Sequence, residues 1–240
     1  MPLKQRFKSS KQSTLQVSLL YHTHTPERAV ATAARLCYAP VSAAELIENL
    51  SDAQVNKVLE TIMKSGHGSA LEHATYTFSI EGVSRALTHQ LVRHRIASFN
   101  QQSQRYVTFS GEPEIVLPHT IAENPRVLST FNKAIKLAFT TYTELIEAGI
   151  PAEDARYILP NACASKIVVT MNIRELLHFF ELRCCNRAQW EIRELARVML
   201  DLVQPTAPYI FMDAGASCRR GSCKEGRMTC GQPFERVSRP

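Results

Sequence analysis

The sequence predicts a single α+β domain with a mainly antiparallel sheet. Strand and helix patterns are interleaved along the chain, but they lack the regular strand–helix period of a doubly wound fold. One strand pattern alternates apolar and polar residues, which is typical of a sheet with one buried face. The chain contains neither a Gly-x-Gly-x-x-Gly motif nor a phosphate-binding P-loop. A dinucleotide would therefore be held by side chains, chiefly arginines.

The first half of the chain contains the clearest strand pattern. Residues 75–83 alternate, with Tyr76, Phe78 and Ile80 expected on the buried face. A glycine-rich stretch at 65–68 is expected to end the helix that precedes this strand. The earlier elements are a strand and two helices, expected over residues 16–21, 42–49 and 52–64.

The second half is expected to be mainly helical. Ser84 is predicted to cap a helix that runs toward Arg93. A long helix opens at Asn124-Pro125 and ends near Ala148, before Gly149. Residue patterns also predict strands over 105–109 and 166–171, and helices over 152–159, 174–183 and 188–203.

Composition excludes several classes of protein. The 240 residues are 45% hydrophobic and 21% charged, which is ordinary for a globular domain and unlike a disordered chain. No apolar run approaches the roughly 20 residues that span a bilayer, and the basic N-terminus lacks the apolar region of a secretory signal. A cytoplasmic location without membrane association is therefore expected. The net charge of +6 favours anionic partners, without selecting among nucleotides, cofactor phosphates and nucleic acid.

The cysteines indicate reduced thiols, because their number is seven and no signal peptide is evident. Cys218, Cys223 and Cys230 lie in a Gly- and Arg-rich segment near the C-terminus. Their spacing differs from the two-residue spacing that is common in zinc knuckles. A loosely ordered basic tail over 216–240 is therefore favoured over a zinc site, and the catalytic domain is expected over 1–215. No metal is expected.

A polar and cationic segment between residues 90 and 106 carries the strongest functional signal. Arg93, Arg95 and Arg105 place guanidinium groups near His94, among several amide and hydroxyl side chains. Guanidinium groups bind phosphate with two hydrogen bonds, and amides read the edges of heterocycles. This combination is suited to a nucleotide. The structural alternative is a basic helix end followed by a polar turn.

This segment resembles the signature of the flavin-dependent thymidylate synthases, in which Arg-His-Arg is followed after seven residues by Ser. Residues 93–103 match that pattern, and Asn100 and Ser103-Gln104-Arg105-Tyr106 match its flanks. Three further segments resemble the same family in the same order, so that the resemblance covers about residues 21–211. These segments are residues 66–73, 154–160 and 172–183, the last followed by Ala188-Gln189.

The resemblance implies a homotetramer built around a sheet flanked by helices, with active sites where subunits meet. It implies methylation of dUMP to dTMP with methylenetetrahydrofolate as the carbon donor and with FAD, reduced by NADPH, as the hydride source. By match, His67 would lie near the flavin and folate. FAD would contact Ser69, Arg93, His94, Arg95, Asn100, Gln101, Asn172, Arg174 and His178. The dUMP site would comprise Gln90, Arg93, Gln101, Gln102, Ser103, Gln104, Arg105, Arg156 and Arg183.

Within this set, Arg183 is the expected catalytic residue. A guanidinium beside the uracil edge stabilises the anion left when N3–H ionises, and the ring then becomes electron-rich. Ser103 is expected to be a substrate ligand rather than a nucleophile, because no histidine or acid is evident to activate it. No motif of the unrelated, cysteine-dependent thymidylate synthases surrounds any of the cysteines.

Three positions depart from the pattern of many family members. Gln101 stands where many members have glutamate, Gln104 replaces a glycine of some members, and His178 replaces an asparagine of others. An amide at position 101 supplies no negative charge. Any role that requires a carboxylate at this position is therefore in doubt.

Two other functions remain as alternatives. A nucleic-acid-binding protein would use the same arginines along a stripe, with steep salt dependence, whereas the enzyme needs them to converge on one pocket. A flavin- or nucleotide-binding relative without activity is the second alternative. The intact arginines at positions 93, 156, 174 and 183 argue against it.

Overall fold

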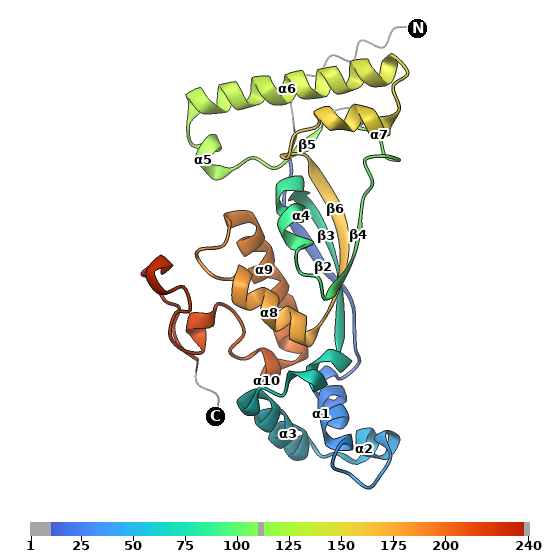
Figure 1. The fold of residues 1–240 in the computed structure, drawn as a ribbon, viewed down its shortest axis with the longest axis vertical. Coiled ribbons are helices and arrows are strands. Elements are labelled where there is room, and N and C mark those ends of the chain that lie inside the picture. Colours follow the sequence, from blue (N-terminus) through green and yellow to red (C-terminus); the bar gives the residue numbers. More distant parts are fainter. Residues whose placement is uncertain (1–10, 110–112, 238–240) are drawn as a thin grey trace. The chain divides into compact units, whose positions relative to one another are not determined.

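The computed structural model describes residues 11–109 and 113–237, and the chain divides into two compact units. The first unit comprises the segment through Gln16, Ile80–Gln90 and Asn100–Ile167. The second comprises Val17–Ser79, Leu91–Phe99 and the chain from Val168 onward. Figure 1 follows these segments by colour. Within the described ranges, no helix is both long and apolar enough to cross a membrane.

The main sheet has the strand order β2-β3-β6-β4 and is antiparallel, with helices flanking it. These findings confirm the predicted fold class. β3 also confirms the predicted alternation, because Tyr76, Phe78 and Ile80 are all 0% exposed. The strands are β2 (Gln16–His22), β3 (Thr75–Ser84), β6 (Ala164–Asn172) and β4 (Ala97–Gln101). A separate parallel pair joins β1 (Lys11–Gln12) and β5 (Glu114–Ile115).

The second unit contains two groups of helices. In one group, α1 packs against α2 and α3, and in the other, α8 packs against α9 (Figure 1). Ser42 and Ser51 form capping boxes at α2 and α3, and Gly66 ends α3 in the left-handed region with φ 74°. The helices are α1 (Pro26–Leu36), α2 (Ala43–Asn49), α3 (Asp52–Ser65), α8 (Ile173–Arg183), α9 (Trp190–Val203) and α10 (Pro208–Phe211).

The sequence reading did not anticipate α1. Thr25-Pro26-Glu27 carries the usual signal for a helix start, with proline at the first helical position and an acid in the first turn, and it was overlooked. Thr25 itself has a positive φ of 44° and provides no side-chain cap. The predicted helices over 42–49, 52–64, 174–183 and 188–203 are confirmed with small shifts at their ends.

The first unit contains α4 (Arg85–Leu91), α5 (His119–Ala122), α6 (Pro125–Glu147) and α7 (Ala152–Ala155). The predicted caps are present: the Ser84 hydroxyl accepts a hydrogen bond from the Leu87 amide, and Asn124 Oδ1 accepts one from the Val127 amide. The remaining short elements are 3₁₀ helices, η1 (Gly68–His73), η2 (Arg156–Ile158), η3 (Gln204–Thr206), η4 (Ser217–Arg219) and η5 (Gly226–Met228).

The predicted strand at 105–109 is wrong. This segment is a turn and a loop, and the Val107 amide donates to the Ser103 carbonyl. The strand lies earlier, as β4, in a stretch that the sequence reading took as polar. Tyr106 and Val107 have high β-propensity, but tertiary pairing determines which segment joins the sheet.

The C-terminal segment contacts α8 within the second unit. The Glu181 carboxylate accepts from Arg220 at 2.5 Å and from Lys224 at 2.6 Å. Burial opposes ionisation of Glu181, but these two cations lower its pKa overall. Cys218 is buried, and its sulfur accepts from the Phe234 amide. The boundary between residues 215 and 216 stays a prediction.

Gly82 is the position where the first unit most requires a glycine. Its φ is +72°, and an added Cβ would lie 2.0 Å from the Thr14 carbonyl oxygen. Gly82→Ala should lower the free energy of unfolding by the roughly 1–2 kcal/mol expected for a left-handed L-residue, plus a steric contribution of about 1–3 kcal/mol. Urea denaturation followed by circular dichroism measures the loss.

The matched control is Gly149→Ala. Gly149 has φ +84° and nothing within 4 Å of an added Cβ, so only the backbone contribution should appear. Equal losses for the two variants would show that the approach of Thr14 to Gly82 does not constrain the fold.

Candidate functional site

The second unit contains a hydrogen-bonded chain of three polar side chains, two of which are buried. His94 Nδ1 lies 2.8 Å from Glu175 Oε1, and Arg183 Nε donates to His94 Nε2 at 3.1 Å. His94 is 4% exposed and Glu175 is 6% exposed. The His94 ring also meets Phe179 edge to face, with the ring centroids 5.0 Å apart. Two predicted site residues, His94 and Arg183, are therefore bonded directly to each other, and His94 is held on its other side by Glu175, which the prediction did not include.

The environment of His94 favours its neutral form. Burial lowers the pKa of His94, with further lowering from Arg183 and His178, against an opposing effect of Glu175. The acceptor role of Nε2 agrees with this direction, because a protonated imidazole has no free acceptor nitrogen.

The Arg183 guanidinium is half-buried and has a second cation nearby. Burial lowers the pKa of Arg183, and the charge of Arg93 lowers it further. Arg93 itself is exposed, in the turn that follows α4. A bound anion would relieve the repulsion between these two side chains. The pair therefore suits a nucleotide, as the sequence predicted for both residues.

His94, Glu175 and His178 also form a group whose candidate metal-ligand atoms lie within 4.8 Å of one another. A metal would need a free lone pair on His94, but Nε2 already accepts from Arg183. The guanidinium would also repel a cation. The donor set fits a hydrogen-bonded chain better than a metal centre. Among the described residues, the three C-terminal cysteines do not form such a group.

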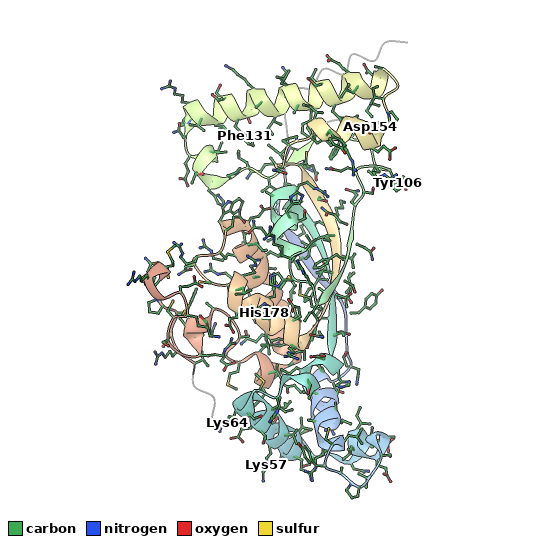
Figure 2. All side chains as sticks on the ribbon, viewed as in Figure 1. Lys57, Lys64, Tyr106, Phe131, Asp154 and His178 are labelled. Atoms are coloured by element: carbon green, nitrogen blue, oxygen red, sulfur yellow. The ribbon has the colours of Figure 1, made fainter. Side chains whose placement is uncertain are left out.

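The other predicted FAD ligands of this unit lie mainly at the surface. His67, Ser69, Arg95 and His178 are exposed, and Figure 2 labels His178 on α8. Two further predicted FAD ligands already form a hydrogen bond or an ion pair within the unit. Asn172 Oδ1 accepts from the Glu175 amide at 2.9 Å and so caps α8, and Arg174 pairs with Glu72 at 2.6 Å.

The predicted dUMP ligands of the first unit include two arginines that meet at one acid. Arg105 forms hydrogen bonds of 3.0 and 2.8 Å with the Glu153 carboxylate, and Arg156 Nε donates to the Glu153 carbonyl at 3.0 Å. The Ser103 hydroxyl accepts from the Arg105 amide. Ser103 thus helps to hold the loop in place, and among the described residues no histidine or acid is hydrogen-bonded to its hydroxyl.

Gln101 joins three elements of the first unit. Its side-chain nitrogen donates to Thr88 Oγ1 at 3.2 Å and to Ser165 Oγ at 2.8 Å. The Thr88 hydroxyl in turn donates to the Arg85 carbonyl. Thr88 and Ser165 are both buried and were not identified from the sequence. Their separation of 13 and 64 residues from Gln101 leaves no local signal for this contact.

A cavity of about 600 Å³ lies beside this loop, also within the first unit. Gln102, Ser103 and Gln104 line it together with Gly82 and the segment at Lys11–Thr14. Arg105, Arg156 and Gln90 are not among its lining residues. The cavity thus contains part of the predicted dUMP set. Asn100 is exposed, and the Gln90 side-chain amide donates to the Ala86 carbonyl of its own helix.

Comparison with known proteins assigns both units to one family. The family model of the thymidylate synthase complementing protein matches residues 18–209. The flavin-dependent thymidylate synthase of Geobacter sulfurreducens is 56% identical over 223 residues, which are 92% of this chain and 96% of that protein. The enzyme of that name from Clostridium tetani is 47% identical over 237 residues, or 92% and 95% of the two chains.

A solved structure has a similar fold. The UMP/dUMP methylase PolB from Streptomyces cacaoi, bound with 5-Br dUMP, superposes with a TM-score of 0.75 at 26% identity. The match covers 86% of this chain and 98% of that chain.

The lowered pKa of His94 has a consequence for stability. An unfolded histidine protonates near its ordinary pKa of about 6.5, whereas folded His94 stays neutral to lower pH. The unfolded state then binds more protons, so the free energy of unfolding should fall as pH drops through about 6.5 and below. Urea denaturation between about pH 8 and pH 5.5 should show a weaker pH dependence for His94→Gln than for the wild type.

His24→Gln is the control, because His24 is exposed and its removal should leave the pH dependence unchanged. If His94→Gln retained the full wild-type pH dependence, protonation of His94 would not be coupled to folding.

Proposed function

The chain belongs to the flavin-dependent thymidylate synthase family, and on that premise we propose that it methylates dUMP at the uracil ring to form dTMP. The main structural support for this proposal is the half-buried guanidinium of Arg183. It is held by a hydrogen bond to His94 and lies near the charge of Arg93. A cation held in this way is suited to an anion that develops on a bound ring.

Arg183 is the proposed catalytic residue. Its N–H groups would face the uracil edge and stabilise the negative charge that remains when N3–H is lost. The ring carbon then has the electron density to attack a one-carbon electrophile. This route requires no enzyme nucleophile, in agreement with Ser103 acting as a ligand and with the buried Cys163 and Cys184, whose thiol pKa values burial raises to about 12.

We propose FAD as the flavin, with NADPH as its reductant and methylenetetrahydrofolate as the carbon donor. When bound, the reduced flavin supplies the hydride that brings the transferred carbon to the methyl level. The net balance is one carbon from the folate and two electrons from NADPH for each dTMP formed. His67 would lie near the flavin and folate.

The side chains of the second unit fit an anionic dinucleotide. The exposed arginines can bind a diphosphate, and Arg174 lies so close to Gly68 that an added Cβ would be 3.3 Å from its Nε. A glycine at this position leaves room for the Arg174 side chain to lie against the backbone. The proposed FAD ligands are Ser69, Arg93, His94, Arg95, Asn100, Gln101, Asn172, Arg174 and His178. Of these residues, His94 is buried, so it would contribute from the interior side of the FAD site.

The nucleotide phosphate would be bound by the exposed arginines of the proposed dUMP set. Arg105 and Glu153 are about half exposed, at 50% and 49%. Exposed ion pairs contribute little stability, so a phosphate can replace the carboxylate at modest cost. The remaining ligands would be Gln90, Arg93, Gln101, Gln102, Ser103, Gln104, Arg156 and Arg183. A homotetramer with active sites at subunit interfaces is part of the same proposal, and a cytoplasmic location stays a prediction.

The colour of the protein tests the flavin assignment. The purified chain should be yellow, or become yellow with added FAD, and should bleach under anaerobic NADPH. Addition of dUMP and methylenetetrahydrofolate should then restore the colour with one dTMP formed for each flavin reoxidised. Omission of dUMP is the control. A colourless protein that takes up no FAD would contradict the proposal, and salt-sensitive retention on RNA or DNA would then favour nucleic-acid binding.

Removal of Arg183 tests its catalytic role. Arg183→Ala should lower turnover by about 10²–10³-fold, the usual effect of losing a group that stabilises developing charge. The flavin spectrum and the unfolding midpoint should stay near those of the wild type. Arg126→Ala, at an exposed position on α6, is the matched loss of one arginine and should turn over normally. Normal dTMP formation by Arg183→Ala would refute the role.

A further inference from the structure

Glu175 is a buried acid that the proposed reaction does not use directly. It lies in the first turn of α8, where its amide is capped by Asn172. Only 6% of its surface is exposed, and its carboxylate lies against His94 Nδ1. Removing a carboxylate from water is costly unless it is paired. A negative side chain is also stabilised near the N-terminus of a helix. The Glu175 carboxylate is therefore stabilised both by its contact with His94 and by its position in the first turn of α8.

The proton positions along this chain follow from the chemistry of arginine. A guanidinium has only donors, so in the contact between Arg183 Nε and His94 Nε2 the imidazole must accept. His94 Nε2 then carries a lone pair, and the ring proton is on Nδ1. Glu175 Oε1 accepts that proton at 2.8 Å. The three residues thus form one chain with a single direction of donation, from Arg183 to His94 to Glu175.

The orientation of this chain determines what Arg183 can offer a substrate. Its Nε–H is committed to His94, which fixes the plane of the guanidinium. The four N–H groups on its two terminal nitrogens are not needed for this contact. If the proton of His94 moved to Nε2, two N–H groups would face each other and Arg183 would lose its support.

We propose that Glu175 is a positioning residue for Arg183, and that it acts by accepting the Nδ1 proton of His94 and so fixing the tautomer that supports the guanidinium. The proposal rests on the proposed function of Arg183. A second guanidinium and a second imidazole lie near the chain: Arg93 is close to Arg183, and the His178 ring centroid is 5.8 Å from that of His94. Within the described part of the chain, Glu175 is the carboxylate that opposes the lowering of the His94 pKa.

The test compares two variants of Glu175. Glu175→Gln keeps an acceptor oxygen for Nδ1–H, and kcat/KM for dUMP should stay within about threefold of wild type. Glu175→Met has a similar length without an acceptor, and kcat/KM should fall by about 10–100-fold, as is usual when the partner that orients a functional histidine is lost. Glu60→Gln removes an acid that pairs with Lys64 on the exposed face of α3 and should leave kcat/KM unchanged.

A spectroscopic measurement separates this role from simple packing. ¹⁵N NMR of histidine-labelled protein should show a protonated Nδ1 and an unprotonated Nε2 for His94, identified by its loss in His94→Gln. Glu175→Gln should keep this signature, and Glu175→Met should lose it. This measurement needs no substrate, so a wild type that forms no dTMP would defeat the proposed function while leaving the tautomer testable.

Three results would overturn the inference. The first is normal kcat/KM in folded Glu175→Met. The second is impaired Glu175→Met with an unchanged His94 signature, which would mean that the effect does not pass through the tautomer. The third is a loss in Glu175→Gln equal to that in Glu175→Met while the signature persists.

Discussion

The second unit is organised by the hydrogen bond between Glu175 and His94. Two ionisable side chains that are almost fully buried must satisfy each other. This requirement ties the turn after α4 to the start of α8, over a separation of 81 residues. The start of α8 is also tied to the segment before β3, because the Ile173 amide donates to the Ala74 carbonyl. Arg93 and Arg95 are exposed and flank His94 in the sequence. Because His94 is held in place, the backbone from which the two arginine side chains project is also held in place.

Three arginines of the candidate site, Arg105, Arg174 and Arg183, make two kinds of contact. Arg105 and Arg174 pair with exposed acids, and such pairs exchange readily for other anions because water and salt screen them. Arg183 instead pairs with a neutral ring, is half-buried and has lost part of its hydration. The first kind suits the capture of phosphate groups. The second kind suits a reacting group, since its orientation is already set when the substrate arrives.

Local pattern predicted most of the fold, because the caps and the alternation are local features. The caps at Ser84 and Asn124 and the buried face of β3 were all predicted from neighbouring residues. The sequence reading was wrong at 105–109, where β-propensity was outweighed by pairing of β4 with β6.

The arginines of the candidate site were found through their spacing and through resemblance to a family. Glu175 was not found, because an acid inside an otherwise apolar helix face reveals its partner only in three dimensions. Thr88 and Ser165 escaped for the same reason. Each is an ordinary hydroxyl in the sequence, and its importance arises from contact with Gln101.

The hydroxyl of Thr88 has a consequence for the unusual amide at position 101. Because this hydroxyl already donates to the Arg85 carbonyl, it can only accept from residue 101, and a carboxylate has no proton to give. A glutamate here would face a lone pair on Thr88 and would force that hydroxyl to abandon Arg85. The single hydroxyl proton of Thr88 therefore couples the two positions. With glutamine at position 101 this proton serves the Arg85 carbonyl, and with an acid there it would have to serve the acid instead.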